Sequence, residues 1–154
     1  MQTGQRNKTV PTIGSKIAGP LGAVHLPRLW AKLLLSSREL LPDDYDRCGD
    51  GFDAMTIQAL GLDREKLISF VRTEQPTYMA LEAWVLHETR GGALDAKKIE
   101  AHNRAILSYR HDDATARSMR ASSGVTDTSI GDAATLNSLD DFDQLHAQIT
   151  SLSR

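Results

Sequence analysis

The sequence predicts an all-α protein: a compact bundle of about five short helices with a flexible N-terminal arm and a C-terminal amphipathic helix. Apolar residues recur at helical spacing in successive short segments. Residues that favour helix ends, chiefly Asp, Gly and Pro, stand between those segments. No stretch of any length alternates apolar and polar residues as a half-buried strand does. With 154 residues, the chain has the usual size of one domain.

The first helix is expected to begin at Pro27, because proline fits the first turn of a helix, where its missing N–H is not needed. Its apolar residues then lie on one face, namely Leu26, Leu29, Trp30, Leu33 and Leu34. Residues 36–53 form a long connection after this helix. Within it, Gly49 and Gly51 indicate a tight turn with positive φ.

The second and third helices are marked by their end residues. Asp53 is expected to cap the second helix, which runs to about Leu60 and stops at Gly61. Asp63 is expected to cap the third helix. The residues of that helix predicted to point inward are Leu67, Ile68 and Val71.

The fourth and fifth helices show the clearest apolar stripes. The fourth starts at residues 75–77, ends at Gly91 and Gly92, and has a stripe of Tyr78, Leu81, Trp84 and Val85. Asp95 is expected to cap the fifth helix. Its inward positions are Ile99, His102, Ile106 and Tyr109. A histidine on such a stripe is interpreted as part of the core rather than as a metal ligand.

Composition divides the chain into four parts. Residues 1–19 are polar and aperiodic and are predicted to be a flexible basic arm. Residues 20–112 are expected to form the helical core domain. Residues 113–136 are rich in small and polar residues and are predicted to be a mobile linker. Residues 137–154 are expected to form the C-terminal helix.

The C-terminal helix is predicted from a capping-box pattern and a stripe. Ser138 and Asp141 have the spacing of a capping box. The apolar face that follows consists of Leu139, Phe142, Leu145, Ile149 and Leu152. A single amphipathic helix is not stable alone. We therefore expect it to dock on the main domain, with binding to a partner as the alternative.

The charge of the chain is unevenly distributed. The net charge is −2, but no Asp or Glu occurs before residue 39, whereas six basic residues do, at Arg6, Lys8, Lys16, Arg28, Lys32 and Arg38. Such an arm can contact nucleic acid or an acidic partner, but the basic residues are scattered, so we expect a solvated leader instead and regard nucleic acid as an unlikely partner. The single cysteine and the absence of a long apolar run favour a soluble cytoplasmic protein without a membrane span.

No cofactor and no metal is predicted. Pro20 and Leu21 occupy the positions where a phosphate-binding loop needs Lys and then Ser or Thr. A calcium loop beginning at Asp46 would place Cys48 and Ile57 at positions that require oxygen ligands. Neither chemistry is therefore supported by the sequence.

Arg28 is a stronger candidate for binding. It lies in the first turn of a predicted helix, where the helix dipole favours anions, and a guanidinium can hold a carboxylate or phosphate with two parallel hydrogen bonds. The alternative is that Arg28 pairs with a structural carboxylate such as Asp53.

Several short motifs resemble the bacterial family called domain of unknown function 5069. They are Gly-Ala-Val-His-Leu-Pro-Arg at 22–28, Leu-Pro-Asp-Asp-Tyr at 41–45, Gly-Asp-Gly-Phe-Asp at 49–53, Trp84, Ile-Glu-Ala-His-Asn at 99–103 and Ser-Gly-Val at 123–125. The resemblance implies a helical bacterial protein to which no function is assigned. His102 stands where the family pattern has a tryptophan, which supports a packing role for that position.

These residues give five candidates for ligand binding: His25, Arg28, Tyr45, Asp53 and Asn103. The preferred hypothesis is a non-catalytic module that binds a small anion or a protein partner. The alternative is a small cytoplasmic enzyme in which Asp53 or His25 acts as general base and Arg28 holds an anionic substrate. A weaker alternative is nucleic-acid contact through the basic arm.

Overall fold

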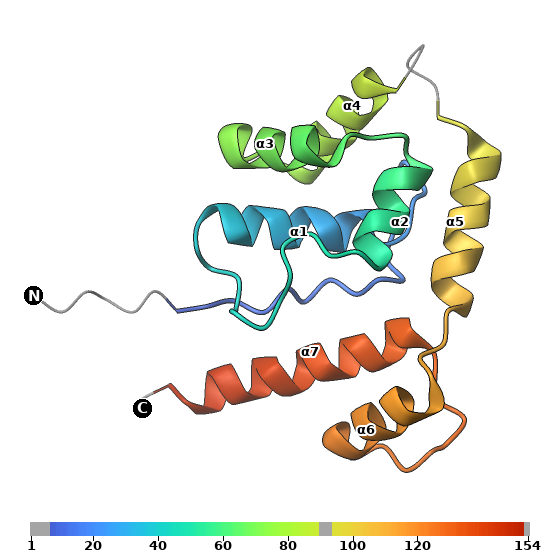
Figure 1. Ribbon diagram of the computed structural model, residues 1–154. Helices are drawn as coiled ribbons and strands as arrows, with labels where there is room; N and C mark the ends of the chain where they lie inside the picture. The colour runs from blue at the N-terminus through green and yellow to red at the C-terminus, as the bar shows by residue number, and fades with distance from the viewer. Residues whose placement is uncertain (1–6, 90–93, 153–154) are drawn as a thin grey trace, which may run out of the picture.

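The computed structural model describes residues 7–89 and 94–152. Within these ranges the chain is all-α, as predicted, with seven helices, no β-strand and two isolated bridges (Figure 1). The helices are α1 (Leu26–Ser37), α2 (Phe52–Ala59), α3 (Arg64–Glu74), α4 (Tyr78–Glu88), α5 (Ala96–Ser108), α6 (Asp113–Ser123) and α7 (Ala133–Thr150). No helix of the described residues is both long enough and apolar enough to cross a membrane.

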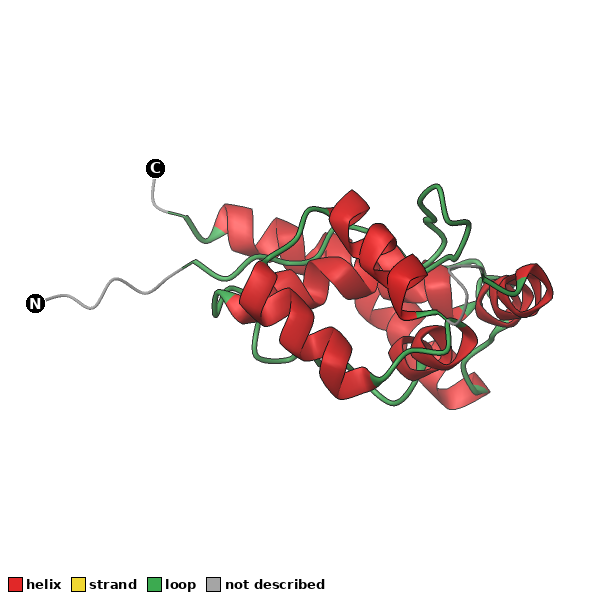
Figure 2. Ribbon diagram, turned by 90° about the horizontal axis from the view of Figure 1, so that it is seen from above, coloured by secondary structure: helices red, strands yellow, loops and turns green. Residues whose placement is uncertain are grey.

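Helix α1 lies at the centre of the fold. It packs against α2, α3 and α4, while α5 packs on α2, and α6 packs on α7 (Figure 1). The N-terminal segment runs between α1 and α7, and Val10 donates its backbone N–H to Gln148 of α7. Seen from above, all the regular elements are helices joined by loops (Figure 2).

The hydrophobic core is formed mainly by the first four helices. Its buried members are Ala23, Leu26, Leu29, Leu33, Cys48, Ile57, Leu60, Leu67, Ile68, Val71, Leu81 and Val85. The residues predicted to point inward from α3 are all buried, and so are Leu81 and Val85 of α4. Helical periodicity therefore identified the buried faces of these helices correctly.

Several predicted helix ends are confirmed. The side chains of Asp63 and Asp95 accept hydrogen bonds from the first turns of α3 and α5. Gly61 follows α2 with a φ of 66°, as expected of a glycine at a helix end. The predicted stop at Gly91 and Gly92 lies outside the described residues, and α4 ends at Glu88.

The start of α2 differs from the prediction. Its N-cap is Gly51, with a φ of −90°, and neither Gly49 nor Gly51 has positive φ. Asp53 lies inside the first turn and does not cap the helix. Its carboxylate instead accepts hydrogen bonds from groups outside the helix, which hold it away from the capping position.

Two segments expected to be mobile contain packed or helical residues where they are described. Val10 and Ser15 of the predicted arm are each 2% exposed, because residues 10–15 pack between α1 and α7. Residues 113–136 contain α6 and the start of α7. Asp112 caps α6, and Gly124 ends it with a φ of 73°.

Helix α7 docks on the main domain as expected, but through a different face. It begins after Asp132, which caps it, so Ser138 and Asp141 form no capping box. Its buried residues are Ala133, Ala134, Leu136 and Asp141. Phe142, Ile149 and Leu152 of the predicted inward face are more than half exposed.

Candidate functional site

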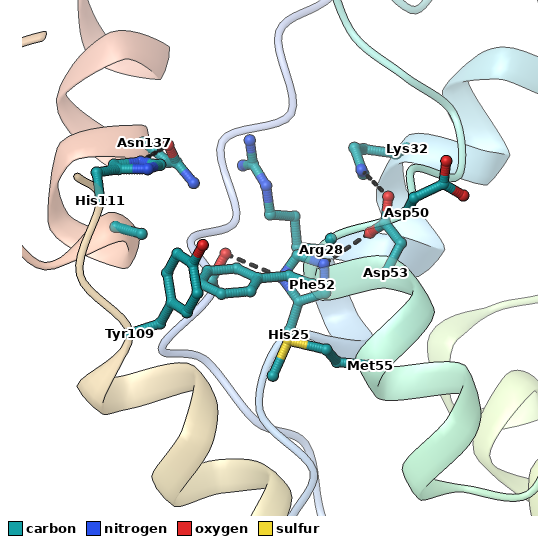
Figure 3. Close-up of a pocket in the computed structure, with 13 residues that line it drawn as sticks. His25, Arg28, Lys32, Asp50, Phe52, Asp53, Met55, Tyr109, His111 and Asn137 are labelled. Carbon is teal, nitrogen blue, oxygen red and sulfur yellow. Dashed lines mark hydrogen bonds and ion pairs between the residues drawn. The ribbon is translucent and has the colours of Figure 1, made fainter. Parts of the chain in front are cut away.

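A pocket of about 500 Å³ lies between α1 and α2 on one side and the 109–111 segment with α7 on the other (Figure 3). It is lined by Ser15, His25, Arg28, Lys32, Asp50, Gly51, Phe52, Asp53, Met55, Tyr109, His111, Ala133 and Asn137. Three of the five predicted candidates, His25, Arg28 and Asp53, are therefore brought together at one cavity.

Helix α1 supplies the polar side of this pocket. His25, Arg28 and Lys32 are spaced three and four residues apart, so they share one face of the helix. All three are buried, and the residues Arg28 and Lys32 are each 7% exposed. His25 is the N-cap of α1 but makes no side-chain hydrogen bond to the helix, which leaves its ring for other partners.

Asp53 lies at the centre of the polar cluster. Its carboxylate accepts hydrogen bonds from Nε2 of His25 at 2.6 Å, from Nζ of Lys32 and from the backbone N–H of Gly49 at 2.7 Å. Burial alone would raise the pKa of Asp53, but the hydrogen bond from His25 and the charge of Lys32 lower it to about 2. The carboxylate is therefore ionised at neutral pH.

His25 links Asp53 to a serine of the N-terminal segment. Its Nδ1 lies 2.9 Å from the hydroxyl oxygen of Ser15. Burial lowers the pKa of His25, and the hydrogen bond to Asp53 only partly opposes this effect. The ring is therefore neutral at physiological pH. The backbone of His25 is also unusual, since its φ of 71° is rare for a residue other than glycine.

The position of Ser15 follows from a turn before α1. Ala18 and Val24 form an antiparallel bridge, and Gly22 has a φ of 87° in the turn between them. His25 also donates its backbone N–H to the carbonyl oxygen of Ile17 at 3.1 Å. The chain thus reverses direction and brings Ser15 beside the start of the helix.

Arg28 pairs with a structural carboxylate, but with Asp141 rather than with Asp53. Two parallel hydrogen bonds of 2.6 and 3.1 Å join the guanidinium to the carboxylate. Arg28 also donates to the carbonyl oxygen of Ile13 at 2.9 Å, and Tyr45 donates its hydroxyl to Asp141 at 2.7 Å. Burial and the bond to Asp141 raise the pKa of Tyr45. This network joins the N-terminal segment, α1 and α7.

Tyr45 and Asn103 lie away from the pocket. Tyr45 lines a neighbouring hollow of about 330 Å³ on the other side of Arg28 and Lys32. Asn103 accepts from the backbone N–H of Val24 at 3.0 Å and donates to the carbonyl oxygen of Gly22 at 2.7 Å. It therefore fixes the turn before α1.

Aromatic side chains form part of the pocket wall. Phe52 makes edge-to-face contacts with His25 and with Tyr109, at ring-centre separations of 5.5 and 5.6 Å. The backbone carbonyl oxygen of Tyr109 accepts a hydrogen bond from the backbone N–H of Ala133 at 2.9 Å. This bond anchors the 109–111 segment to the start of α7. Figure 3 shows the Phe52 ring between the rings of Tyr109 and His25.

The basic residues near the N-terminus do not form a common cationic surface in the described part of the chain. Lys8 lies 3.6 Å from Asp43, and Lys16 lies 3.3 Å from Asp132. Arg28 and Lys32 are paired in the buried cluster. Among the described residues, no group of three or more His, Cys, Asp or Glu side chains is placed to hold a metal ion.

Three residues of the polar cluster were not among the candidates: Ser15, Lys32 and Asp141. Lys32 has a signal in the sequence, since it lies one turn after Arg28 on the same face of a predicted helix. Asp141 is 113 residues from its partner, and the sequence holds no local signal of their pairing. Ser15 lies in a segment without periodicity. It reaches the cluster because the chain reverses direction at the turn of residues 18–24.

Comparison with known protein families finds no family that matches the chain, and comparison with curated proteins finds no match either. Membership of the family that the short motifs resemble stays a prediction.

The buried histidines predict a loss of stability in mild acid. Burial lowers the pKa of both His25 and His102 from 6.5. The unfolded chain therefore takes up protons before the folded chain as the pH falls below about 6.5, so the free energy of unfolding decreases from there downward. Urea unfolding between about pH 7.5 and about pH 5 measures this slope.

The His102→Gln variant should weaken this dependence of the free energy of unfolding on pH. The His87→Gln variant should not, since the His87 side chain is 84% exposed. A free energy of unfolding that stays constant or rises as the pH falls through this range would contradict the expectation.

Proposed function

We propose that the protein binds a small molecule bearing a carboxylate or phosphate group in the pocket between α1, α2 and α7. The observation that carries this proposal is the pair of buried cations, Arg28 and Lys32, which lie one helical turn apart and both line the cavity. Charged side chains are rarely buried unless they are paired or bind something.

Both cations keep hydrogen-bonding capacity for a ligand. An ammonium group has three donors, and the described residues give the Lys32 ammonium one acceptor, Asp53. Nη2 of Arg28 has one acceptor among them, Asp141. Oxygen atoms of an anionic ligand can therefore bind without breaking either ion pair. The two pairs also neutralise the cations in the absence of the ligand.

The helix ends at the pocket favour negative charge as well. Helices α1 and α2 both begin there, and neither receives a side-chain hydrogen bond from its N-cap residue. The other five helices are each capped by an Asp or Thr side chain. Uncapped first turns leave N–H groups and the positive end of the helix dipole available to an anion.

The rest of the ligand is expected to be apolar or planar. Phe52, Met55 and Tyr109 supply apolar and aromatic surface to the wall of the same pocket. The neighbouring hollow is lined by the carboxylates of Asp44, Asp46 and Asp140, which disfavour an anion there. The preferred pocket is thus the one with the aromatic wall.

Calorimetric titration and thermal unfolding with succinate and with phenyl phosphate test this function. Each probe should bind, and a concentration of about 100 times its dissociation constant should add about 2.7 kcal/mol to the free energy of unfolding. Lys32→Met should weaken binding at least tenfold, because it keeps the length of the side chain and removes the charge. Lys98→Met, on the exposed side of α5, is the matched control.

Two results would contradict the proposal. One is the absence of binding by both probes to the folded protein. The other is equal binding of succinate and its uncharged diamide, since the pocket is expected to recognise the anionic group.

A further inference from the structure

Ser15, His25 and Asp53 form a continuous chain of hydrogen bonds at the pocket. The Ser15 hydroxyl lies 2.9 Å from Nδ1 of His25, and Nε2 of His25 lies 2.6 Å from Oδ1 of Asp53. All three side chains line the cavity, and their residues are 2–3% exposed. Figure 3 shows the His25 ring beside Asp53, with a dashed line marking their hydrogen bond.

The direction of these hydrogen bonds follows from the ionised carboxylate of Asp53 at one end of the chain. An ionised carboxylate only accepts, so Nε2 of His25 must carry the proton that it donates to Asp53. In a neutral ring, Nδ1 is then the acceptor, and the Ser15 hydroxyl donates to it. This is the orientation in which a histidine can take the proton of a serine that attacks an electrophile.

The ring is also held firmly in this position. Asp53 is itself fixed by Lys32 and by the backbone N–H of Gly49, and Phe52 packs against the ring edge to face. His25 adopts a left-handed backbone conformation, which costs free energy in a residue with a β-carbon. Strain of this kind is concentrated at functional sites.

We propose that Ser15 is the nucleophile of an acyl-transfer reaction, with His25 as its general base and Asp53 as a positioning residue. The substrate class is an ester or thioester whose acyl part carries an anionic group. This inference rests on the proposed function, because the anionic group is expected to lie beside Lys32 and Arg28.

The reaction has two balanced stages. Oγ of Ser15 bonds to the carbonyl carbon, its proton passes to Nδ1 of His25, and the carbonyl oxygen becomes negative. The carbonyl re-forms as the bond to the leaving oxygen or sulfur breaks, and the leaving group takes the proton from Nδ1. Water then repeats these steps on the acyl-serine and releases the carboxylic acid. The uncapped first turn of α2 favours the negative charge on the carbonyl oxygen.

The test is acylation of the full-length protein by the mono-p-nitrophenyl ester of succinic acid. We expect a burst of p-nitrophenol and the addition of one succinyl group, which peptide mapping places on Ser15. Acylation should be at least a hundredfold slower in Ser15→Ala and unchanged in Ser69→Ala, an exposed serine of α3. The rate in the wild-type protein should fall as the pH is lowered far enough to protonate His25.

A second measurement does not depend on a variant. A fluorophosphonate probe should label Ser15 of the wild-type protein, and bound succinate should slow the labelling. Absence of acylation and of labelling in a protein that binds succinate would overturn the inference and leave the proposed function intact. Modification of a residue other than Ser15 would also overturn it. Acylation of Ser15 without any binding of succinate would instead contradict the proposed anion site.

Discussion

Replacement of Asp141 by alanine is expected to lower the free energy of unfolding by about 3–5 kcal/mol, the usual cost of removing one partner of a buried ion pair. Asp141 is 2% exposed and holds Arg28 through two hydrogen bonds. Its removal leaves a buried guanidinium without a counter-charge and the Tyr45 hydroxyl without its acceptor. Urea unfolding followed by circular dichroism measures the loss.

The controls separate the ion pair from helix effects. Asp143→Ala changes an exposed residue of the same helix and should alter stability by less than about 0.5 kcal/mol. The double variant Arg28→Met with Asp141→Leu should be clearly more stable than Asp141→Ala, because an apolar pair leaves no unpaired charge. A loss below about 1 kcal/mol for Asp141→Ala would show that the pair does not hold α7 to α1.

Replacement of Asp53 by asparagine is expected to cost a similar amount, about 3–5 kcal/mol, because Lys32 then loses its buried counter-charge. The change keeps the size of the side chain. It also allows an amide N–H₂ group to face Nε2 of His25, which would move the ring proton to Nδ1. Ser15 could then no longer donate to that nitrogen. The variant should therefore lose acylation even under conditions in which it is fully folded.

The matched control is Asp50→Asn. Asp50 lies three residues before Asp53 at the same pocket, but its side chain is 97% exposed and pairs with Arg64 on the surface. An exposed pair contributes about 0–1 kcal/mol, so this variant should be nearly as stable as the wild type. Equal losses in both variants would contradict the central role of the Asp53 carboxylate.

The helices of the main domain could be predicted because their signals are local. Asp63 and Asp95 start helices in the sequence and in the structure, and Gly61 ends one. Helix α6 was missed although Asp112 and Gly124 mark its ends. Its sequence of small and polar residues carries little periodic apolar signal, since Ala116 is its one buried residue within the described chain.

The inward face of α7 could not be predicted from its apolar stripe. The helix turns Asp141 toward α1, because that carboxylate pairs with Arg28. Phe142 and Ile149 are consequently exposed at 56% and 59%. The buried face therefore includes a polar contact between residues far apart in the sequence. Apolar periodicity contains no information on such a contact.

The candidate site could be predicted only in part, because some of its contacts also join residues that are far apart in the sequence. Arg28 was identified by its place in the first turn of a predicted helix, and His25 and Asp53 by the motifs that resemble a known family. Asp53, however, does not cap α2. Its carboxylate accepts hydrogen bonds from His25 and Lys32 and from the loop before α2. Ser15 reaches His25 only because the chain reverses at Gly22. Tyr45 and Asn103, which have equally suitable chemistry, serve the packing of α7 and of the turn before α1.

The most direct test of the account is a nitrogen–proton correlation spectrum of the histidine rings, recorded at neutral pH with and without succinate. We predict that His25 is neutral, that its proton is on Nε2, and that succinate shifts the resonances of its ring while those of the exposed His87 stay in place. A charged His25, a proton on Nδ1, or a ring that does not respond to saturating succinate would contradict the assignment of this cluster as a ligand site.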